Sequence, residues 1–204
     1  MRTLRTCVAI LLLTAGWAYC QSTVNTTHKW AYSTTAGWMN WRTDSTNGAV
    51  IGEYVMSGYF YSPTAGWIHL GDGTPTNGVR YTNATSNDYG VNHDGEGHLR
   101  GYAWCASAGW INFEWTNNLS ASNAPKIDLK TGLLSGWAWG GSLGWISLSN
   151  TTDYVLADRM SNSVDVTSNG IPDAWEISMT GSNGLLNATN DYDNDLYTDY
   201  EEYI

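Results

Sequence analysis

The sequence predicts an all-β protein of four antiparallel β-meander repeats, followed by a small C-terminal module of calcium loops and short helices. Three observations predict this fold. A ten-residue aromatic phrase occurs four times, and aromatic and β-branched residues dominate the repeats without any sustained helical periodicity. Two twelve-residue acidic loops then follow the last repeat.

Residues 1–20 have the pattern of a secretory signal peptide. Arg2 and Arg5 give the positive start, residues 8–13 give the apolar stretch, and Ala18-Tyr19-Cys20 is a small-x-small cleavage site. The apolar stretch is too short to span a bilayer, and no later segment is long enough. We therefore expect a secreted protein that acts outside the cell or at the cell surface.

The repeated phrase has the shared form Gly-aromatic-Ala-aromatic-small-x-x-Ala-Gly-Trp. Its copies, with the residues that follow them, lie at 29–41, 58–70, 101–113 and 136–148. The final tryptophans are 29, 43 and 35 residues apart, which is within the range of repeat architectures. We assign residues 21–150 to one aromatic β-repeat domain. Nothing in the phrase supplies a nucleophile or a base, so the repeat indicates a scaffold.

Each phrase is predicted to form two strands joined by a tight turn. In Trp137-Ala138-Trp139 the two aromatic side chains share one face of a strand, because side chains alternate. The Ser-x-x-Ala-Gly segment supplies the turn, with a glycine that is free to take positive φ. After the turn, Ile and Leu or Phe share one face, and the tryptophan shares the other with a polar residue. These polar residues are Asn40, His69, Asn112 and Ser147.

A further strand is predicted before each phrase. Residues 91–99 and residues 126–135 each indicate a hairpin that leads into the phrase. Each unit is then a three-stranded meander, although the first copy lacks a leading strand unless residues 22–27 supply it. The closure of the four units stays open, because a β-sandwich, a solenoid or a propeller-like ring would each bury their apolar faces.

The cysteines exclude an internal disulfide in the mature chain. Cys7 and Cys20 lie in the predicted signal peptide, which leaves Cys105 alone. Cys105 occupies a position that is Ser or Gly in the other phrases. We therefore interpret it as a tolerated small residue and not as a reactive thiol.

The net charge of -10 is unevenly distributed along the chain. Residues 161–204 contain nine Asp and Glu and no Lys or Arg, whereas residues 21–160 contain ten acidic and seven basic residues. Nucleic acids and anionic membranes are therefore not expected as partners. The change in charge predicts a linker at 151–162 and a separate EF-hand-like module at 163–204.

The acidic end carries the strongest local chemistry in the sequence. An EF-hand-type loop places oxygen ligands at positions 1, 3, 5, 7 and 9 and a carboxylate at position 12, with glycine at position 6 for the turn. The first loop matches these ligand positions with Asp165, Thr167, Asn169, Ile171 (through its backbone carbonyl), Asp173 and Glu176. The second loop matches them with Asp191, Asp193, Asp195, Tyr197, Asp199 and Glu202.

We predict that calcium is a structural cofactor of this module. Gly170 stands at the turn position of the first loop, whereas the second loop has Leu196 there, where positive φ would be strained. Each loop is expected to run into a short helix, at 173–179 and at 198–204. The competing interpretation is a solvated acidic tail, and two loop matches that both end in Glu count against it. Without the ion, the carboxylates would repel one another and loosen the tail.

Two parts of the chain resemble known families. The fourth phrase resembles a GYAW…GWI repeat of bacterial secreted proteins in Gly136-Trp137-Ala138-Trp139 and Leu143-Gly144-Trp145-Ile146. Residues 169–176 and 191–203 are similar to the calcium-binding tails of bacterial surface proteins, which resemble thrombospondin type 3 repeats and dockerins. The resemblances together cover residues 28–204. The thrombospondin-like one implies a calcium-stiffened spacer near a surface, and neither implies catalysis.

These features favour a non-enzymatic protein that acts in adhesion or in glycan or matrix binding. Pyranose rings stack on aromatic faces, and polar neighbours can bond their hydroxyl groups. The tryptophans with polar neighbours on the same face, and so the candidate ligand-binding residues, are Trp38, Trp67 and Trp110. A more ordinary role for a recurring tryptophan is packing against the next repeat, and we expect that role for most of these rings.

Two other functions stay open. Four similar units with unpaired strand edges would suit a structural subunit of an extracellular fibre, matrix or surface layer that self-associates through those edges. A secreted hydrolase is less favoured, because no catalytic residues can be placed. The local histidine cluster at 93–98 offers His93, Asp94 and His98 to a transition metal, but we interpret it as a polar turn.

Overall fold

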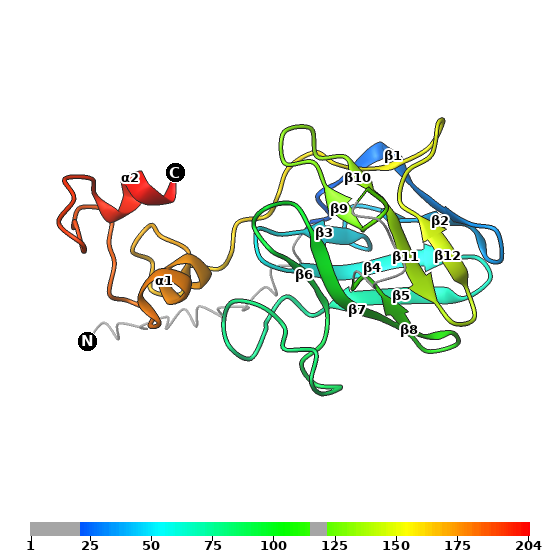
Figure 1. Cartoon of the computed structure of the whole chain (residues 1–204), viewed down its shortest axis with the longest axis horizontal. Helices are drawn as coiled ribbons and strands as arrows, with labels where there is room; N and C mark the ends of the chain where they lie inside the picture. The colour runs from blue at the N-terminus through cyan, green and yellow to red at the C-terminus, as the bar shows by residue number, and fades with distance from the viewer. Residues whose placement is uncertain (1–20, 115–121) are drawn as a thin grey trace, which may run out of the picture.

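Eight antiparallel strands close into a barrel in the computed structural model, which describes residues 21–114 and 122–204 (Figure 1). In sheet order the strands are β1 (Val24–Ser33), β2 (Gly37–Asn40), β4 (Met56–Ser62), β5 (Gly66–Gly71), β7 (Leu99–Cys105), β8 (Gly109–Asn112), β11 (Trp137–Gly140) and β12 (Gly144–Ser147). Strand β12 pairs back to β1 and closes the ring. The prediction of an all-β fold is confirmed, but the closure is that of a barrel and not the β-sandwich, solenoid or propeller-like ring that we considered, because β12 pairs back to β1. The predicted signal peptide, residues 1–20, lies outside the described residues.

Each of the four phrases forms one β-hairpin of the barrel, and the hairpins share one register. The second aromatic residue of the phrase lies opposite its final tryptophan. These opposed pairs are Tyr32 and Trp38, Tyr61 and Trp67, Trp104 and Trp110, and Trp139 and Trp145. The glycine before that tryptophan has φ between 67° and 80° in every copy, a region that residues with a Cβ rarely adopt. The turn therefore requires glycine at this position.

The joints between the hairpins also repeat. At each joint, the polar residue two positions after the final tryptophan lies opposite the second aromatic residue of the next hairpin. These pairs are Asn40 and Tyr61, His69 and Trp104, Asn112 and Trp139, and Ser147 and Tyr32. Because the offset is the same at all four joints, the hairpins follow one another in an approximately fourfold arrangement.

Short strands lead into three of the hairpins. Strand β3 (Ala49–Ile51) pairs with β4, and β6 (Val91–His93) pairs with β7. Before the fourth hairpin, β9 (Lys126–Ile127) pairs with β10 (Leu134–Ser135) in a separate two-stranded sheet.

The first hairpin receives its additional strand from far along the chain. Strand β13 (Val155–Ala157) pairs with β1, at Val24 opposite Ala157 and Lys29 opposite Val155. We expected the whole of segment 151–162 to be a linker because of its polar composition. The structure differs, because β13 lies within this segment. Val155 and Ala157 are buried, and their burial against β1 makes this short segment part of the barrel sheet.

The inner face of the barrel is filled by apolar side chains. Three positions of every phrase point inward, namely the residue between the two aromatic residues and the residues one and three places after the final tryptophan. Their side chains are at most 1 % exposed: Ala31, Met39, Trp41, Phe60, Ile68, Leu70, Ala103, Ile111, Phe113, Ala138, Ile146 and Leu148. Trp41 stacks on Phe60 with ring centroids 4.7 Å apart. Full burial of each large side chain contributes about 1.5–3 kcal/mol.

Cys105 lies buried, without a disulfide partner among the described residues, at the turn end of the barrel interior. The equivalent Ser33 and Ser62 hydroxyls each accept two backbone N–H groups of their turns. The Cys105 thiol lies 3.3 Å from the carbonyl oxygen of Ala65 in the neighbouring hairpin, and the Ser33 hydroxyl donates to the equivalent carbonyl of Leu143. This site takes a small residue.

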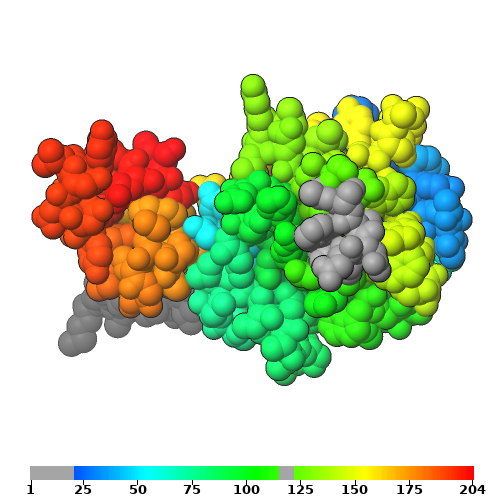
Figure 2. Space-filling model, viewed as in Figure 1, coloured from blue at the N-terminus to red at the C-terminus, as the bar shows by residue number. Residues whose placement is uncertain are grey.

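The C-terminal module forms a second lobe beside the barrel (Figures 1 and 2). It contains α1 (Asp173–Thr180) and α2 (Asp199–Tyr203), close to the two predicted helices. Glu53 of the barrel accepts hydrogen bonds from the Ser163 N–H and the Tyr203 hydroxyl, both at 3.2 Å. Burial and the charge of Glu53 raise the pKa of Tyr203 to about 12, so this hydroxyl stays protonated. No helix in the described part of the chain is long and apolar enough to cross a membrane.

Candidate functional site

The outer face of the barrel carries many exposed aromatic rings. The alternation that buries the apolar residues turns the aromatic residues of the phrases outward. Eight of them are 37–46 % exposed: Trp38, Tyr59, Trp67, Trp104, Trp110, Trp137, Trp139 and Trp145. We call these eight residues the aromatic belt. These residues lie on strands around the barrel and are not gathered in one patch.

Among the described residues, seven of the eight belt rings contact an aromatic ring across their own hairpin. The ring centroids of Trp104 and Trp110 are 4.6 Å apart, and those of Trp139 and Trp145 are 4.9 Å apart. Such cross-strand pairs contribute roughly 0.2–1 kcal/mol each to a sheet. Our expectation that most of these tryptophans pack away against the next repeat is wrong, because the rings pair within a hairpin and keep more than a third of their surface exposed.

The three predicted ligand-binding tryptophans lie on different hairpins. Trp38, Trp67 and Trp110 are 42–46 % exposed, on strands β2, β5 and β8, which are not neighbours in the sheet. Trp38 and Trp67 have ring contacts only within their own hairpins among the described residues. Trp110 also contacts Tyr89, which precedes β6. The structure thus does not bring the three rings together, and it distinguishes Trp110.

The segment 72–90 joins the second hairpin to β6, and the Tyr81 side chain anchors it. The Tyr81 ring is buried, and its hydroxyl accepts the Gly73 N–H at 2.6 Å and donates to the Met56 carbonyl at 3.1 Å. A Cβ on Gly90 would lie 2.2 Å from the Tyr81 ring, so glycine is required there. Burial raises the pKa of Tyr81 far above its usual range, and the hydroxyl stays neutral.

Asp88 fixes the same segment from within. Its side chain is 6 % exposed and accepts hydrogen bonds from the N–H and hydroxyl of Thr82, at 2.9 and 2.5 Å. It also accepts the N–H and hydroxyl of Thr76, at 3.1 and 2.9 Å. The hydrogen bonds from Thr82, followed by those from Thr76, lower the pKa of Asp88 to about 2. The carboxylate is therefore charged at neutral pH, with its charge satisfied inside the loop.

Segment 72–90 and the third hairpin together line an open pocket of about 390 Å³ on the outside of the barrel. The Tyr89 ring meets the Trp110 ring edge-on, with centroids 4.9 Å apart, and the Tyr89 hydroxyl lies 2.7 Å from His69 Nδ1. Burial lowers the pKa of His69, so this ring is neutral at physiological pH. The lining residues are Asn83, Ala84, Thr85, Ser86, Tyr89, Tyr102 and Trp110.

Most of this pocket is missed by sequence reasoning. The repeat pattern identifies Trp110, but residues 83–89 have no strand pattern and belong to no recognisable motif. The available signal is the 43-residue spacing between Trp67 and Trp110, which is the longest of the three spacings and marks an insertion there.

The two acidic loops have the same backbone path. Their fourth and sixth positions have φ between 55° and 92°: Ser168, Gly170, Asn194 and Leu196. The first carboxylate of each loop accepts the N–H of the sixth residue at 2.9 Å, from Gly170 to Asp165 and from Leu196 to Asp191. Leu196 therefore adopts the conformation that glycine adopts in the first loop, at a cost in strain.

Carboxylates gather in the second loop. Ligand oxygens of Asp191, Asp193 and Asp195 lie within 4.8 Å of one another. Asp199 is fully buried, and its carboxylate accepts two backbone N–H groups. Desolvation and the charges of the neighbouring aspartates raise the pKa of Glu202. Asp191, Asp193 and Asp195 could together hold a metal ion, which would neutralise the repulsion.

The first loop uses its last carboxylate differently. Glu176 is fully buried, and its Oε1 accepts the N–H groups of Gly184 and Leu186 at 3.1 and 3.0 Å. Its Oε2 is buried without a hydrogen-bond partner among the described residues. Glu176 thus connects α1 to the segment before the second loop, and one of its oxygens is left for a ligand.

The other predicted ligands lie within their loops. The Thr167 hydroxyl donates to Asp165 at 3.2 Å, and the Asn169 side-chain amide donates to the Leu186 carbonyl at 2.9 Å. Asp173 accepts the N–H of the second residue of the loop. Ile171 is buried, whereas the Tyr197 ring is 62 % exposed.

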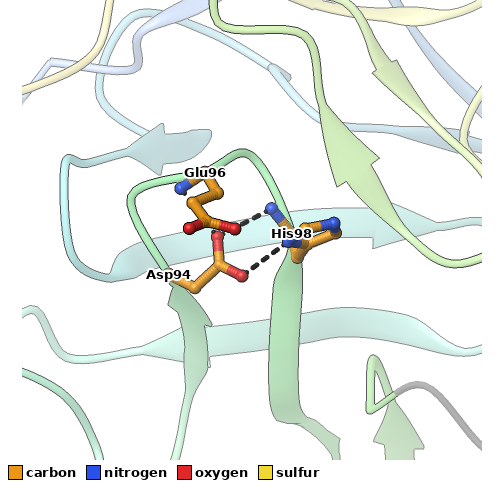
Figure 3. Close-up of side chains that lie close together, drawn as sticks. All are labelled: Asp94, Glu96 and His98. Atoms are coloured by element: carbon orange, nitrogen blue, oxygen red, sulfur yellow. Dashed lines mark hydrogen bonds and ion pairs between the residues drawn. The ribbon is translucent and has the colours of Figure 1, made fainter.

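A second acidic cluster lies in the turn between β6 and β7 (Figure 3). The Asp94 carboxylate accepts the N–H groups of Glu96 and His98, both at 2.9 Å, and lies 2.7 Å from His98 Nδ1. His93 is buried, with its Nδ1 2.7 Å from the Glu53 carbonyl oxygen. The turn's own hydrogen bonds account for the cluster, and His93 takes no part in it.

No protein-family model, curated protein or solved structure matched this chain.

Proposed function

We propose that the protein is a secreted or cell-surface, non-enzymatic binding protein that acts in adhesion through glycan or matrix binding. The observation that carries the proposal is the aromatic belt, in which eight rings are 37–46 % exposed on the outside of one barrel. The packed interior of the closed barrel leaves no room for a ligand inside it. We also propose that the barrel is four copies of one repeat unit, which accounts for the recurrence of the rings.

The chemistry of the belt suits carbohydrates. The C–H faces of a pyranose stack on aromatic rings, while its hydroxyl groups need hydrogen-bond partners at the ring edges. Each outward aromatic residue at a joint has a polar residue directly opposite on the adjacent strand, as at Asn40 and Tyr61 or Asn112 and Trp139. Directly opposed side chains lie within contact distance.

We propose that calcium stiffens the C-terminal module. Support comes from the matching backbone of the two loops and from the three aspartates that converge in the second one. Affinity on the order of 10⁻⁴ to 10⁻³ M is expected, as in extracellular calcium modules. When bound, the ion supplies positive charge to a lobe that has nine acidic and no basic side chains in its sequence.

A structural subunit of an extracellular fibre, matrix or surface layer is the second candidate. The aromatic belt favours this candidate because exposed rings can also pair between molecules. Assembly through strand edges has less support, because each of the eight barrel strands has a partner on both sides. Such a subunit would have to assemble through the belt itself.

The test measures binding and size on the same sample. Neutral and charged oligosaccharides are titrated into the mature protein in millimolar calcium, with tryptophan fluorescence and calorimetry as readouts. Saturable binding by a protein that light scattering shows to be monomeric, both in calcium and in chelator, supports the binding function. Growth into large regular species without glycan binding would replace it with the structural function.

A further inference from the structure

The four hairpins are nearly equivalent, but the surroundings of their final tryptophans are not. Among the described residues, Trp38 and Trp145 each contact one ring, and that ring belongs to their own hairpin. Trp110 contacts Trp104 and Tyr102 of its own hairpin and, in addition, Tyr89 from segment 72–90. An insertion has therefore turned one of four similar surfaces into a walled pocket.

The walls of this pocket have two chemistries. Trp110, Tyr102 and Tyr89 supply aromatic surface, and Asn83, Thr85 and Ser86 supply uncharged polar groups. None of the lining residues is Asp, Glu, Lys, Arg or His. The volume of about 390 Å³ is within the range of small-molecule sites in proteins.

We propose that this pocket is the primary glycan subsite and takes a neutral pyranose unit. This inference rests on the proposed glycan-binding function. The sugar ring stacks on Trp110, and its hydroxyl groups bond to the hydroxyls of Thr85 and Ser86. Both of these side chains are exposed, and neither hydroxyl makes a hydrogen bond to any part of the chain that the structure describes. Without a cation in the lining, uronic or sulfated sugars gain no ion pair and are not preferred.

The polar wall is held in place before any ligand arrives. Asn83 has φ of 55°, and its side-chain oxygen accepts the Gly90 N–H at 3.0 Å. A Cβ on Gly101 would lie 2.4 Å from the Gly90 carbonyl oxygen and 2.5 Å from Asn83 Nδ2, so the segment lies directly against β7. A wall fixed in this way loses little conformational entropy on binding.

The experiment compares quasi-equivalent tryptophans. Maltohexaose, cellohexaose, mannohexaose and chitohexaose serve as neutral probes, and an alginate and a heparin hexasaccharide serve as anionic probes. The wild-type protein is expected to bind at least one neutral probe. Trp110→Ala should weaken that binding about tenfold or more, whereas Trp38→Ala should change it less than twofold.

A second variant separates loss of binding from loss of folding. Thr85→Ala combined with Ser86→Ala alters exposed side chains that support no internal hydrogen bond, so the melting temperature should not change. Neutral-probe binding should still weaken about fivefold. If glycans bind but Trp38→Ala is the damaging variant, or if the anionic probes are preferred, the subsite is wrong and the glycan function stands. If no probe binds the wild type, the proposed function itself falls.

Discussion

The barrel and the C-terminal module are stabilised in different ways. The barrel buries apolar side chains from all four hairpins, including Trp41, Phe60 and Phe113 at 0 % exposure. The most deeply buried side chains of the module include Glu176 and Asp199, whose carboxylates are bonded to backbone N–H groups. Burial of apolar surface does not depend on ions, whereas a lobe organised around carboxylates depends on what neutralises them.

The largest expected effect tests the barrel side of this comparison. Phe60→Ala should lower the free energy of unfolding by about 3–5 kcal/mol, because it leaves a cavity beside Trp41. Urea denaturation followed by tryptophan fluorescence measures the change. Val166→Ala is the control, because that side chain is 73 % exposed and its loss should cost less than about 0.5 kcal/mol. A loss below about 1 kcal/mol for Phe60→Ala would contradict the packed interior.

The second prediction tests the module. At 10 mM calcium and the affinity expected above, ion binding should stabilise residues 163–204 by about 1.4–2.7 kcal/mol. Hydrogen exchange should show this protection in the module and no change in the barrel. Asp193→Asn should abolish much of the calcium-dependent protection. Glu96→Gln removes one exposed charge outside the loops and should leave the protection intact. Equal protection of the module in calcium and in chelator would argue against calcium binding.

The third prediction concerns acid. The pKa of Asp88 is lowered in the folded protein, so its contribution to stability is present above the ordinary value of 3.8 and is lost as the pH falls toward about 2. Segment 72–90 should therefore stay ordered at pH 5 and loosen between about pH 4 and 2. The fluorescence of Trp110 beside Tyr89 reports this change. Asp88→Asn should loosen the segment at every pH, and a wild-type transition near pH 6 would be inconsistent with this assignment.

The smallest effect is expected at Leu196. This residue has φ of 86° and is 92 % exposed, so Leu196→Gly relieves strain and removes little packing. Calcium binding to the second loop should tighten by about 1 kcal/mol, or roughly fivefold. Gly170→Ala at the matching position of the first loop, with φ of 92°, should act in the opposite direction. Calorimetric titration of both variants with calcium measures these changes in affinity. Weaker calcium binding by Leu196→Gly would contradict backbone strain at Leu196.

The repeat phrase predicts which side chains share a face, because alternation within a strand is a local property. It puts Ile146 and Leu148 on one face and Trp145 on the other, and the structure agrees; that the tryptophan face stays exposed was not predicted. The closure into a barrel is not predictable in this way, because pairs such as Asn40 and Tyr61 join backbones of different hairpins and leave no side-chain signature.

The candidate site is predictable only in part. Trp110 follows from the repeat, but its special position depends on the path of segment 72–90 across β7. That path is fixed by the buried ring of Tyr81 and the hydrogen bonds of Asp88, neither of which belongs to a periodic pattern. The acidic loops are predictable because their spacing is itself the signal, although the buried Glu176 carboxylate shows a packing role that spacing does not reveal.

Strand β1 has a consequence for the order of events during synthesis. It pairs with β12 and β13 near the end of the barrel sequence, and Asn25 bonds to Asp158 across 133 positions of the chain. The first strand therefore leaves the ribosome long before two of its neighbours exist. Bringing such distant segments together is slow compared with forming a hairpin. The hairpins are expected to form early and in sequence, and the seam between β1 and β12 is expected to close last.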